Sequence, residues 1–385
     1  MARIVRRVIR RLWFALVFVC LSAVVAPAHA QLLAAFRDPV DSSFDMSDWL
    51  LRKKGFLPVP IIITEPALGY GGGVALAWFR RPAGESQSKT AFSPPTIIAA
   101  AGFYTAGGSY GGGGGVFHPF RNDSFRYLGL LAVASLDLKF FGFDPNGPLA
   151  DDPREYTIRG LFSNQRLQAR LGQSAWFLGA NYTFLSSKSS FETSLPAEVV
   201  PGDVEVKLGG LGATVEYDTR DNFLDARRGV DLSANVTWYE PAFGSDRSFG
   251  KLKVAGLFYA QPRRPWEIAF RVDGRSAWGN TPFFYKPYLS MRGLEALEYT
   301  DNVAVLGEGE LRFGIGTRWT VLGFGGAGWT GESWSALGDD SAVPAGGFGF
   351  RYLVARQLGL RTGLDFAFGP HGQFAFYIQT GSPWR

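Results

Sequence analysis

"VAVLGEGELRFGI", residues 303–315, alternates strictly between two kinds of side chain. The odd positions are apolar or glycine, whereas the even positions include Glu308, Glu310 and Arg312. Successive side chains of a β-strand point to opposite faces of the sheet. The stretch therefore predicts a strand that carries all its charges on one face.

The same alternation recurs along the chain. Trp266, Ile268, Phe270 and Val272 alternate with mostly charged residues, and similar runs lie near 230–238. Two architectures give this pattern. A soluble β-sandwich turns its polar face outward, whereas a membrane β-barrel encloses its polar face and turns the apolar face to lipid. Alternation alone does not distinguish them.

The number and spacing of the segments favour the barrel. A tilted strand needs about ten residues to cross a bilayer. We expect sixteen strands, at 58–66, 70–80, 96–106, 110–119, 124–140, 155–171, 175–187, 205–219, 229–240, 248–261, 266–278, 302–316, 318–330, 343–355, 358–369 and 372–381. An even number, with short periplasmic turns alternating with longer external loops, is typical of bacterial outer-membrane barrels. The predicted fold is an all-β, sixteen-stranded antiparallel transmembrane barrel.

The first thirty residues have the features of a secretory signal peptide. Five arginines precede an apolar run at 12–26, and Ala28-His29-Ala30 is a typical cleavage site. The run is about 15 residues long, shorter than the roughly 20 that a spanning helix needs. We expect export, with the mature chain starting at Gln31.

Removal of this segment changes the charge balance. Lys+Arg falls from 39 to 39 − 5 = 34, which equals the 34 Asp+Glu, so the net charge of +5 becomes zero. The basic character thus gives no support for a nucleic-acid partner. The single cysteine, Cys20, also lies in the signal, which argues against a small disulfide-stapled scaffold.

We predict three parts: a signal peptide (1–30), a short periplasmic segment (31–55) and one barrel domain (56–385). "MSDWLLRKKG" (46–55) has the length of a single short helix, too little for a folded domain. Tryptophans near the strand ends predict interfacial girdles, with ordinary core positions as the alternative: Trp78, Trp176, Trp238, Trp278, Trp329 and Trp384.

Arg292 and Gly293 lie in "PYLSMRGLEALEY" (287–299), within the sixth external loop. An arginine folded back into the barrel lumen needs carboxylates on the inner wall, and Glu308 and Glu310 face that way by parity. Glycine permits a backbone conformation that a side chain would forbid. We expect a lumen anchor; the alternative is a solvated loop arginine.

A further motif lies at the periplasmic end of the expected barrel. In "VEYDTRDNFLDARRG" (215–229), Asp218, Arg220 and Asp221 precede Gly229, which predicts a tight charge-paired periplasmic turn or, alternatively, a contact for a periplasmic partner.

Pro58, Pro60 and Pro66 crowd the first expected strand. Proline removes a ladder donor, so the seam between the first and last strands should be the weakest in the wall. The alternative is that the prolines lie outside the hydrogen-bonded span.

These motifs, in this order, resemble the outer-membrane assembly barrel superfamily, also called bacterial surface antigen proteins, which includes BamA- and TamA-like insertases and two-partner secretion transporters. The resemblance rests on "VEYDTRDNFLDARRG", "MRGL" (291–294), "GELRF" (309–313) and "PIIITEPALGYGGG" (60–73). It covers essentially all of the mature chain and identifies a short member without POTRA domains. In such proteins the seam is a lateral gate.

The resemblance implies that Arg292, next to Gly293, pairs with Glu310. Two departures stand out. Leu294 replaces the usual aromatic residue, and Gly326 replaces an aspartate of the thirteenth strand. Glu308 is expected to substitute for that aspartate, or else the pairing is weaker.

The expected function is insertion or translocation of polypeptides at the outer membrane through the lateral seam, with outer-membrane lipid and polypeptide clients as partners. A passive pore or transporter for small solutes or lipids is the alternative, and a membrane-embedded hydrolase a third. His118 and His371 are the only mature histidines and no catalytic motif is present. We therefore predict no enzyme activity, no catalytic or metal-binding residues and no cofactor.

Overall fold

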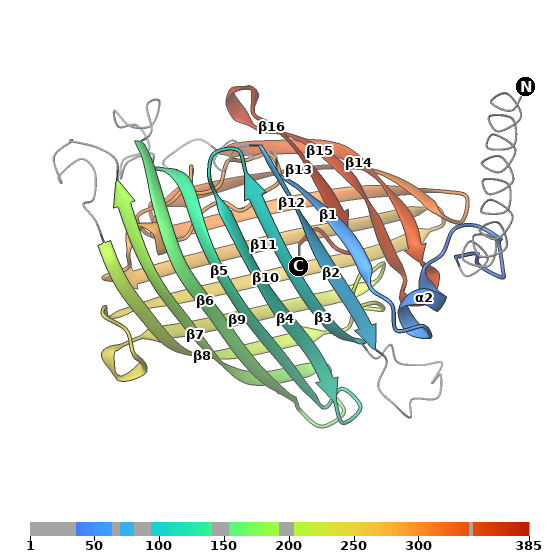
Figure 1. The fold of residues 1–385 in the computed structure, drawn as a ribbon, viewed down its shortest axis with the longest axis horizontal. Helices are drawn as coiled ribbons and strands as arrows, with labels where there is room; N and C mark the ends of the chain where they lie inside the picture. The colour runs from blue at the N-terminus through green and yellow to red at the C-terminus, as the bar shows by residue number, and fades with distance from the viewer. Residues whose placement is uncertain are drawn as a thin grey trace, which may run out of the picture.

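The computed structural model describes residues 36–63, 70–80, 94–140, 154–191, 204–338 and 342–384. The signal peptide and Pro66 lie outside these ranges. Within them, sixteen strands form one sheet in which each strand pairs antiparallel with the next in the chain. The sheet curls into a barrel (Figure 1).

The strand bounds are β1 (Leu57–Ile63), β2 (Gly71–Arg80), β3 (Thr96–Thr105), β4 (Tyr110–Phe120), β5 (Phe125–Phe140), β6 (Arg154–Arg170), β7 (Trp176–Phe191), β8 (Val204–Asp218), β9 (Gly229–Tyr239), β10 (Phe249–Arg263), β11 (Trp266–Gly279), β12 (Val303–Ile315), β13 (Trp319–Gly331), β14 (Val343–Ala355), β15 (Leu360–Phe368) and β16 (Phe374–Thr380). Every predicted segment is a strand. The largest difference is at the end of β7, which extends four residues further (191 − 187).

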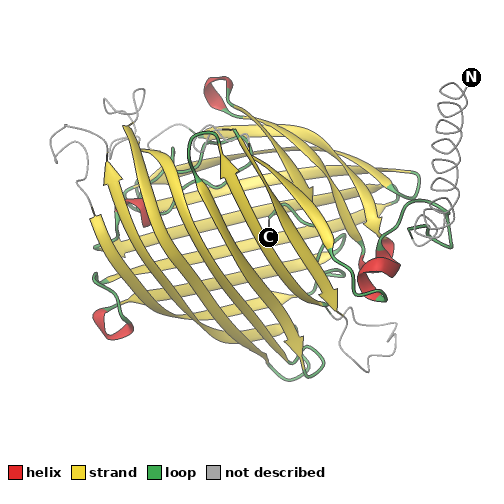
Figure 2. Cartoon of the chain, viewed as in Figure 1, coloured by secondary structure: helices red, strands yellow, loops and turns green. Residues whose placement is uncertain are grey.

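Within the described ranges, the helices are few and short (Figure 2). They are α2 (Ser47–Leu51), as predicted within 46–55, and four 3₁₀ turns: η1 (Pro241–Phe243), η2 (Phe283–Tyr285), η3 (Arg356–Leu358) and η4 (Pro370–Gly372). No helix in the described ranges is long and apolar enough to span a membrane.

Burial along β11 shows which way the two faces of the sheet point. The charged residues Glu267 and Asp273 are 6% and 3% exposed, whereas the apolar Ile268 and Phe270 are 47% and 45% exposed. A soluble sandwich would show the reverse pattern, because water favours the polar face. The charges are therefore enclosed and the apolar side chains lie on the outside, as predicted for a barrel in lipid.

The barrel is nearly closed. β1 and β16 approach each other, but no hydrogen-bonded ladder joins them among the described residues. The wall therefore has one unsealed seam, whereas the sequence predicted a weak but paired one.

Residues 36–56, here called the N-terminal clamp, hold one end of this seam. Leu50 of α2 is fully buried against Leu57 of β1 and Leu358 of η3. The Met46 N–H donates to the Val354 carbonyl of β14 at 2.7 Å. The clamp thus links β1 to the β14–β15 turn without a β1–β16 ladder.

Candidate functional site

The Arg292 guanidinium contacts three carboxylates. Nε donates to Glu308 at 2.8 Å, Nη2 to Glu310 at 2.8 Å and Nη1 to Asp365 at 2.6 Å. All four side chains are buried. Charge-assisted bonds of this kind are strong, but desolvation offsets much of the Coulomb gain. The cluster therefore orders the loop against the charged face of β12 and β15 more than it adds net stability.

Sequence reasoning missed Asp365 as a partner of Arg292. Its parity on β15 placed it on the polar face, but β15 is three strands away from β12. The second arginine on Asp365 is Arg351 of β14, which binds it through two hydrogen bonds of 2.6 and 2.8 Å. The cluster thus joins loop, β12, β14 and β15.

Gly293 has two reasons to be glycine. Its φ is +97°, in the region that L side chains rarely adopt. A Cβ there would also lie 2.9 Å from the Phe368 carbonyl oxygen. The Gly293 N–H donates to the Tyr377 hydroxyl of β16 at 3.2 Å. The loop therefore contacts the strand that borders the seam.

The two departures from the family motif have structural explanations. Leu294 is buried with Leu289, Met291 and Leu306 in an apolar cluster. A Cβ on Gly326 would collide with the Gly307 carbonyl and lie 3.0 Å from the Met291 sulfur. The space that an aspartate would need at this position is filled by the loop itself.

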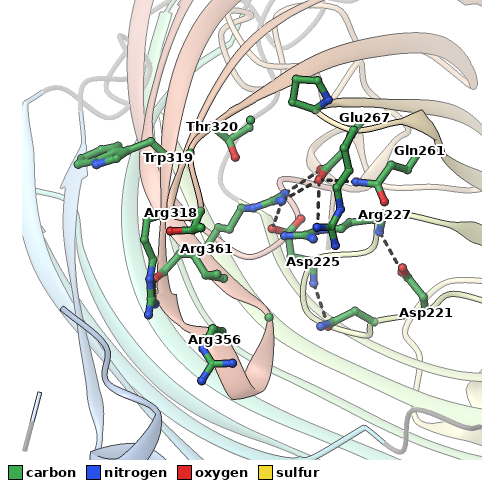
Figure 3. Close-up of a pocket in the computed structure, with 18 residues that line it drawn as sticks. Asp221, Asp225, Arg227, Gln261, Glu267, Arg318, Trp319, Thr320, Arg356 and Arg361 are labelled. Carbon is green, nitrogen blue, oxygen red and sulfur yellow. Dashed lines mark hydrogen bonds and ion pairs between the residues drawn. The ribbon is translucent and has the colours of Figure 1, made fainter. Parts of the chain in front are cut away.

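The Arg292 cluster continues toward the short-turn end of the barrel through alternating charges. Arg312 contacts Glu310 at 2.6 Å and Asp225 at 3.0 Å. Arg361 contacts Glu267 at 2.8 Å. Arg227 lies 3.2 Å from the same carboxylate. A cavity of about 500 Å³ opens beside these last residues, and Figure 3 shows Arg227 and Arg361 converging on Glu267.

The C-terminal residues also join this cluster. The Ser382 N–H donates to the Leu224 carbonyl at 2.8 Å, and Trp384 Nε1 donates to Glu308 at 2.9 Å. The C-terminus accordingly lies within the outline of the barrel in Figure 1.

The prediction that Trp384 belongs to an interfacial girdle is wrong, because its indole binds a buried carboxylate. Trp176 and Trp278, by contrast, are exposed.

The turn motif is a charge-paired structure. Arg220 binds Asp218 through two hydrogen bonds of 2.8 Å, and Asp218 also accepts one from Arg126 of β5 at 2.9 Å. Asp221 accepts from two backbone N–H groups of the same turn. Gly229 has φ +98°. The Asp218 and Arg220 side chains are buried, which favours the structural interpretation over a partner contact.

Pro58 and Pro60 lie within β1, inside the paired span. Alternate residues of a strand direct their N–H groups to opposite neighbours. Because proline has no N–H, the unbroken ladder to β2 must use the donors of Val59 and Ile61. The two proline nitrogens therefore face β16, and the seam edge of β1 lacks two donors.

His118 and His371 are both exposed. His118 Nδ1 is 2.8 Å from the Thr96 hydroxyl, and His371 lies in η4. In the described part of the chain, no group of three His, Cys, Asp or Glu residues is placed to hold a metal ion.

The architecture is a sixteen-stranded antiparallel β-barrel of the kind expected for the outer-membrane assembly superfamily. No protein-family model and no curated protein matches the sequence. Solved structures match the fold.

The chain is similar to BamA from Haemophilus ducreyi lacking POTRA domains 1-3, with a TM-score of 0.53 and 10% identity over 84% of this chain and 69% of that one. It is also similar to CdiB from Escherichia coli, with a TM-score of 0.56 and 11% identity over 84% and 61% of the two chains. CdiB from Acinetobacter baumannii has a TM-score of 0.51 and 9% identity, over 84% and 58%. At these identities the similarity shows the fold, and the predicted barrel is confirmed.

Proposed function

We propose that this protein is a bacterial outer-membrane barrel that assists the insertion or translocation of polypeptides through the seam between β1 and β16. The observation that carries the proposal is the unsealed seam, where β1 presents an edge with two donors missing. The fold similarity to BamA and CdiB supports it, as does the sequence resemblance.

The seam suits strand addition. An extended segment binds a sheet edge mainly through main-chain hydrogen bonds. The edge of β16 carries no proline, so each of its outward N–H and C=O groups is available in principle to a client strand. The edge of β1 offers fewer hydrogen-bond donors, which lowers the free energy needed to separate β1 from β16. We infer that clients pair with β16.

The β11–β12 loop has a supporting role in this proposal. Folded into the lumen, it would be held by Arg292 against Glu308, Glu310 and Asp365, while Gly293 contacts β16 through Tyr377. This lumen anchor would keep the border strand in place when the seam opens. The N-terminal clamp does the same for β1, from what we propose is the periplasmic side.

A seam-locking experiment tests the function. The mature sequence has no cysteine, so pairs can be introduced between residues 60–62 of β1 and 374–378 of β16 and oxidised. In liposomes, the reduced protein should accelerate folding of a second barrel and the oxidised form should not. A control pair at Phe258 and Phe270, registered partners on β10 and β11, should have no effect.

The alternative is a passive pore or transporter. It predicts steady conductance with no acceleration of client folding, and equal behaviour of the locked and unlocked seam. Ester hydrolysis that is lost on substitution of His118 or His371 would instead favour a hydrolase.

A further inference from the structure

A second site, which shares no residue with the Arg292 cluster, lies on the polar face of the sheet. A cavity of about 440 Å³ is bordered by β6, β7, β9, β10, β11 and the loop segment 285–288. Five cationic side chains line it, and no carboxylate does among the described residues: Arg166, Lys251, Lys253, Arg275 and Lys286.

The strand register brings the charges together. Lys253 of β10 lies between Asn235 of β9 and Arg275 of β11 in the two ladders. Lys251 is two residues along the same face. Like charges at this spacing repel one another and raise the free energy of the empty site.

The positive charge is only partly neutralised. Arg275 donates to Asp273 at 2.7 Å. Arg271 also donates to Asp273, at 3.2 Å, so two arginines share one carboxylate. None of the lysines that line the cavity forms an ion pair with a carboxylate in the described ranges. Lys251 is held by neutral groups, at 2.7 Å from the Tyr285 carbonyl oxygen and 3.7 Å from the centre of its ring.

Part of the remaining lining is polar and hydrogen-bonded. Asn164 donates to Thr183 at 2.8 Å, and Asn235 donates to Asn181. Gly212 of β8 leaves the room for these groups, because a Cβ there would lie 2.6 Å from the Asn181 oxygen. Amide and hydroxyl groups thus lie beside the cations, and their hydrogen bonds to one another hold this part of the lining in place.

We propose that this cavity binds a small polyvalent oxyanion that carries a phosphate or pyrophosphate group. A monovalent anion would leave most of the charge uncompensated, whereas lysine ammonium groups and an arginine are suited to phosphate oxygens. Lys253 is exposed to the cavity and gives the anion a point of entry. A soluble anion and a lipid head group offer the same chemistry. The site does not depend on the seam or on the function proposed above.

Calorimetric titration of the full mature chain in neutral detergent with inorganic pyrophosphate tests the site. We expect one bound anion per chain, with an affinity that falls as salt rises. Lys253→Gln should weaken binding about tenfold, and Lys251→Gln with Lys253→Gln should weaken it further. Lys53→Gln, on the exposed part of the N-terminal clamp, should bind like the wild type.

Thermal unfolding of each variant shows whether the barrel is intact. The Lys253 side chain forms no hydrogen bond or ion pair within the described ranges, so Lys253→Gln should retain the wild-type midpoint of unfolding. Phosphorus analysis of the purified protein separates the two sources: stoichiometric phosphorus, absent from the double variant, would identify a lipid head group. The proposal is overturned if the wild type neither binds pyrophosphate nor carries phosphorus, or if Lys253→Gln binds as tightly as the wild type.

Discussion

Glu308 of β12 lies directly opposite Gly326 of β13 in the antiparallel ladder. The family motif has an aspartate at the position of Gly326, and here the neighbouring strand supplies the carboxylate at the same level of the barrel. Asp365 adds a third acid from β15. Of the two expectations, the contacts favour substitution by Glu308: Arg292 binds Glu308, Glu310 and Asp365, so the carboxylates around it are rearranged.

This arrangement predicts that Gly326→Asp is harmful, although it restores the family residue. The new Cβ would collide with the Gly307 carbonyl, and its charge would lie beside Glu308. We expect a loss of about 1–3 kcal/mol, typical of overpacking, seen as a lower midpoint of thermal unfolding. Gly325→Ala is the matched control, because its Cβ would meet nothing closer than 3.8 Å. A stabilised Gly326→Asp variant would refute the rearranged cluster.

Arg292→Ala and Glu310→Ala should not have additive effects. Removing one partner of a buried ion pair leaves the other uncompensated and costs about 3–5 kcal/mol. The double variant loses both charges together, so its cost should be well below the sum. Protection of the β11–β12 loop from protease and the free energy of unfolding are the two measurements. Additivity within about 0.5 kcal/mol would argue against direct pairing.

Gly293→Ala should release the loop. The position combines φ +97° with a backbone oxygen at 2.9 Å from the new Cβ, so both conformational strain and steric overlap oppose it. Protease should then cut within 287–299 faster than in the wild type. Gly307→Ala, which meets no atom closer than 3.7 Å, provides the comparison and should leave the cutting rate unchanged.

Acid should detach the N-terminal clamp. A hydrogen bond from Arg356 lowers the pKa of Asp38, and one from Arg318 lowers the pKa of Asp41. A carboxyl whose pKa is lower in the folded state contributes stability above its unfolded pKa of about 3.9 and loses it as the pH falls. Alkaline pH should have no such effect.

Fluorescence of Trp49 and proteolysis within 36–56, followed as the pH falls from 7 to below the lowered pKa values of Asp38 and Asp41, measure this release. Asp38→Asn with Asp41→Asn should show it already at neutral pH. Asp48→Asn, which removes only an exposed contact with Arg52, should not. A clamp that stays bound throughout this range would contradict the assignment.

Pro58→Val with Pro60→Val should close the seam. The substitutions restore two N–H donors on the edge that faces β16, so the strands can pair. We expect slower client folding in liposomes and faster disulfide formation between introduced cysteines on β1 and β16. An unchanged rate in both assays would show that the prolines do not keep the seam open.

The alternation of side chains is a local property, so the sequence alone predicted the strands, and the number and spacing of these segments favoured the barrel over the sandwich. The parity of Glu308 and Glu310 on the enclosed face, the sixteen strands and the short helix after Met46 could all be read from neighbours in the chain. Gly293 was identified for the same reason, since a glycine requirement depends on local backbone geometry.

Only the tertiary structure showed which distant residues meet. Asp365 reaches Arg292 and Trp384 reaches Glu308 because closing the sheet brings separate strands around one space. Lys253 faces Arg275 through the register of the β10–β11 ladder. Parity predicts the face on which a side chain lies, but the register and the curvature fix its partners across the barrel. That is why the sequence predicted the anchor arginine, while the third carboxylate, the inward C-terminus and the cationic cavity emerged only from the fold.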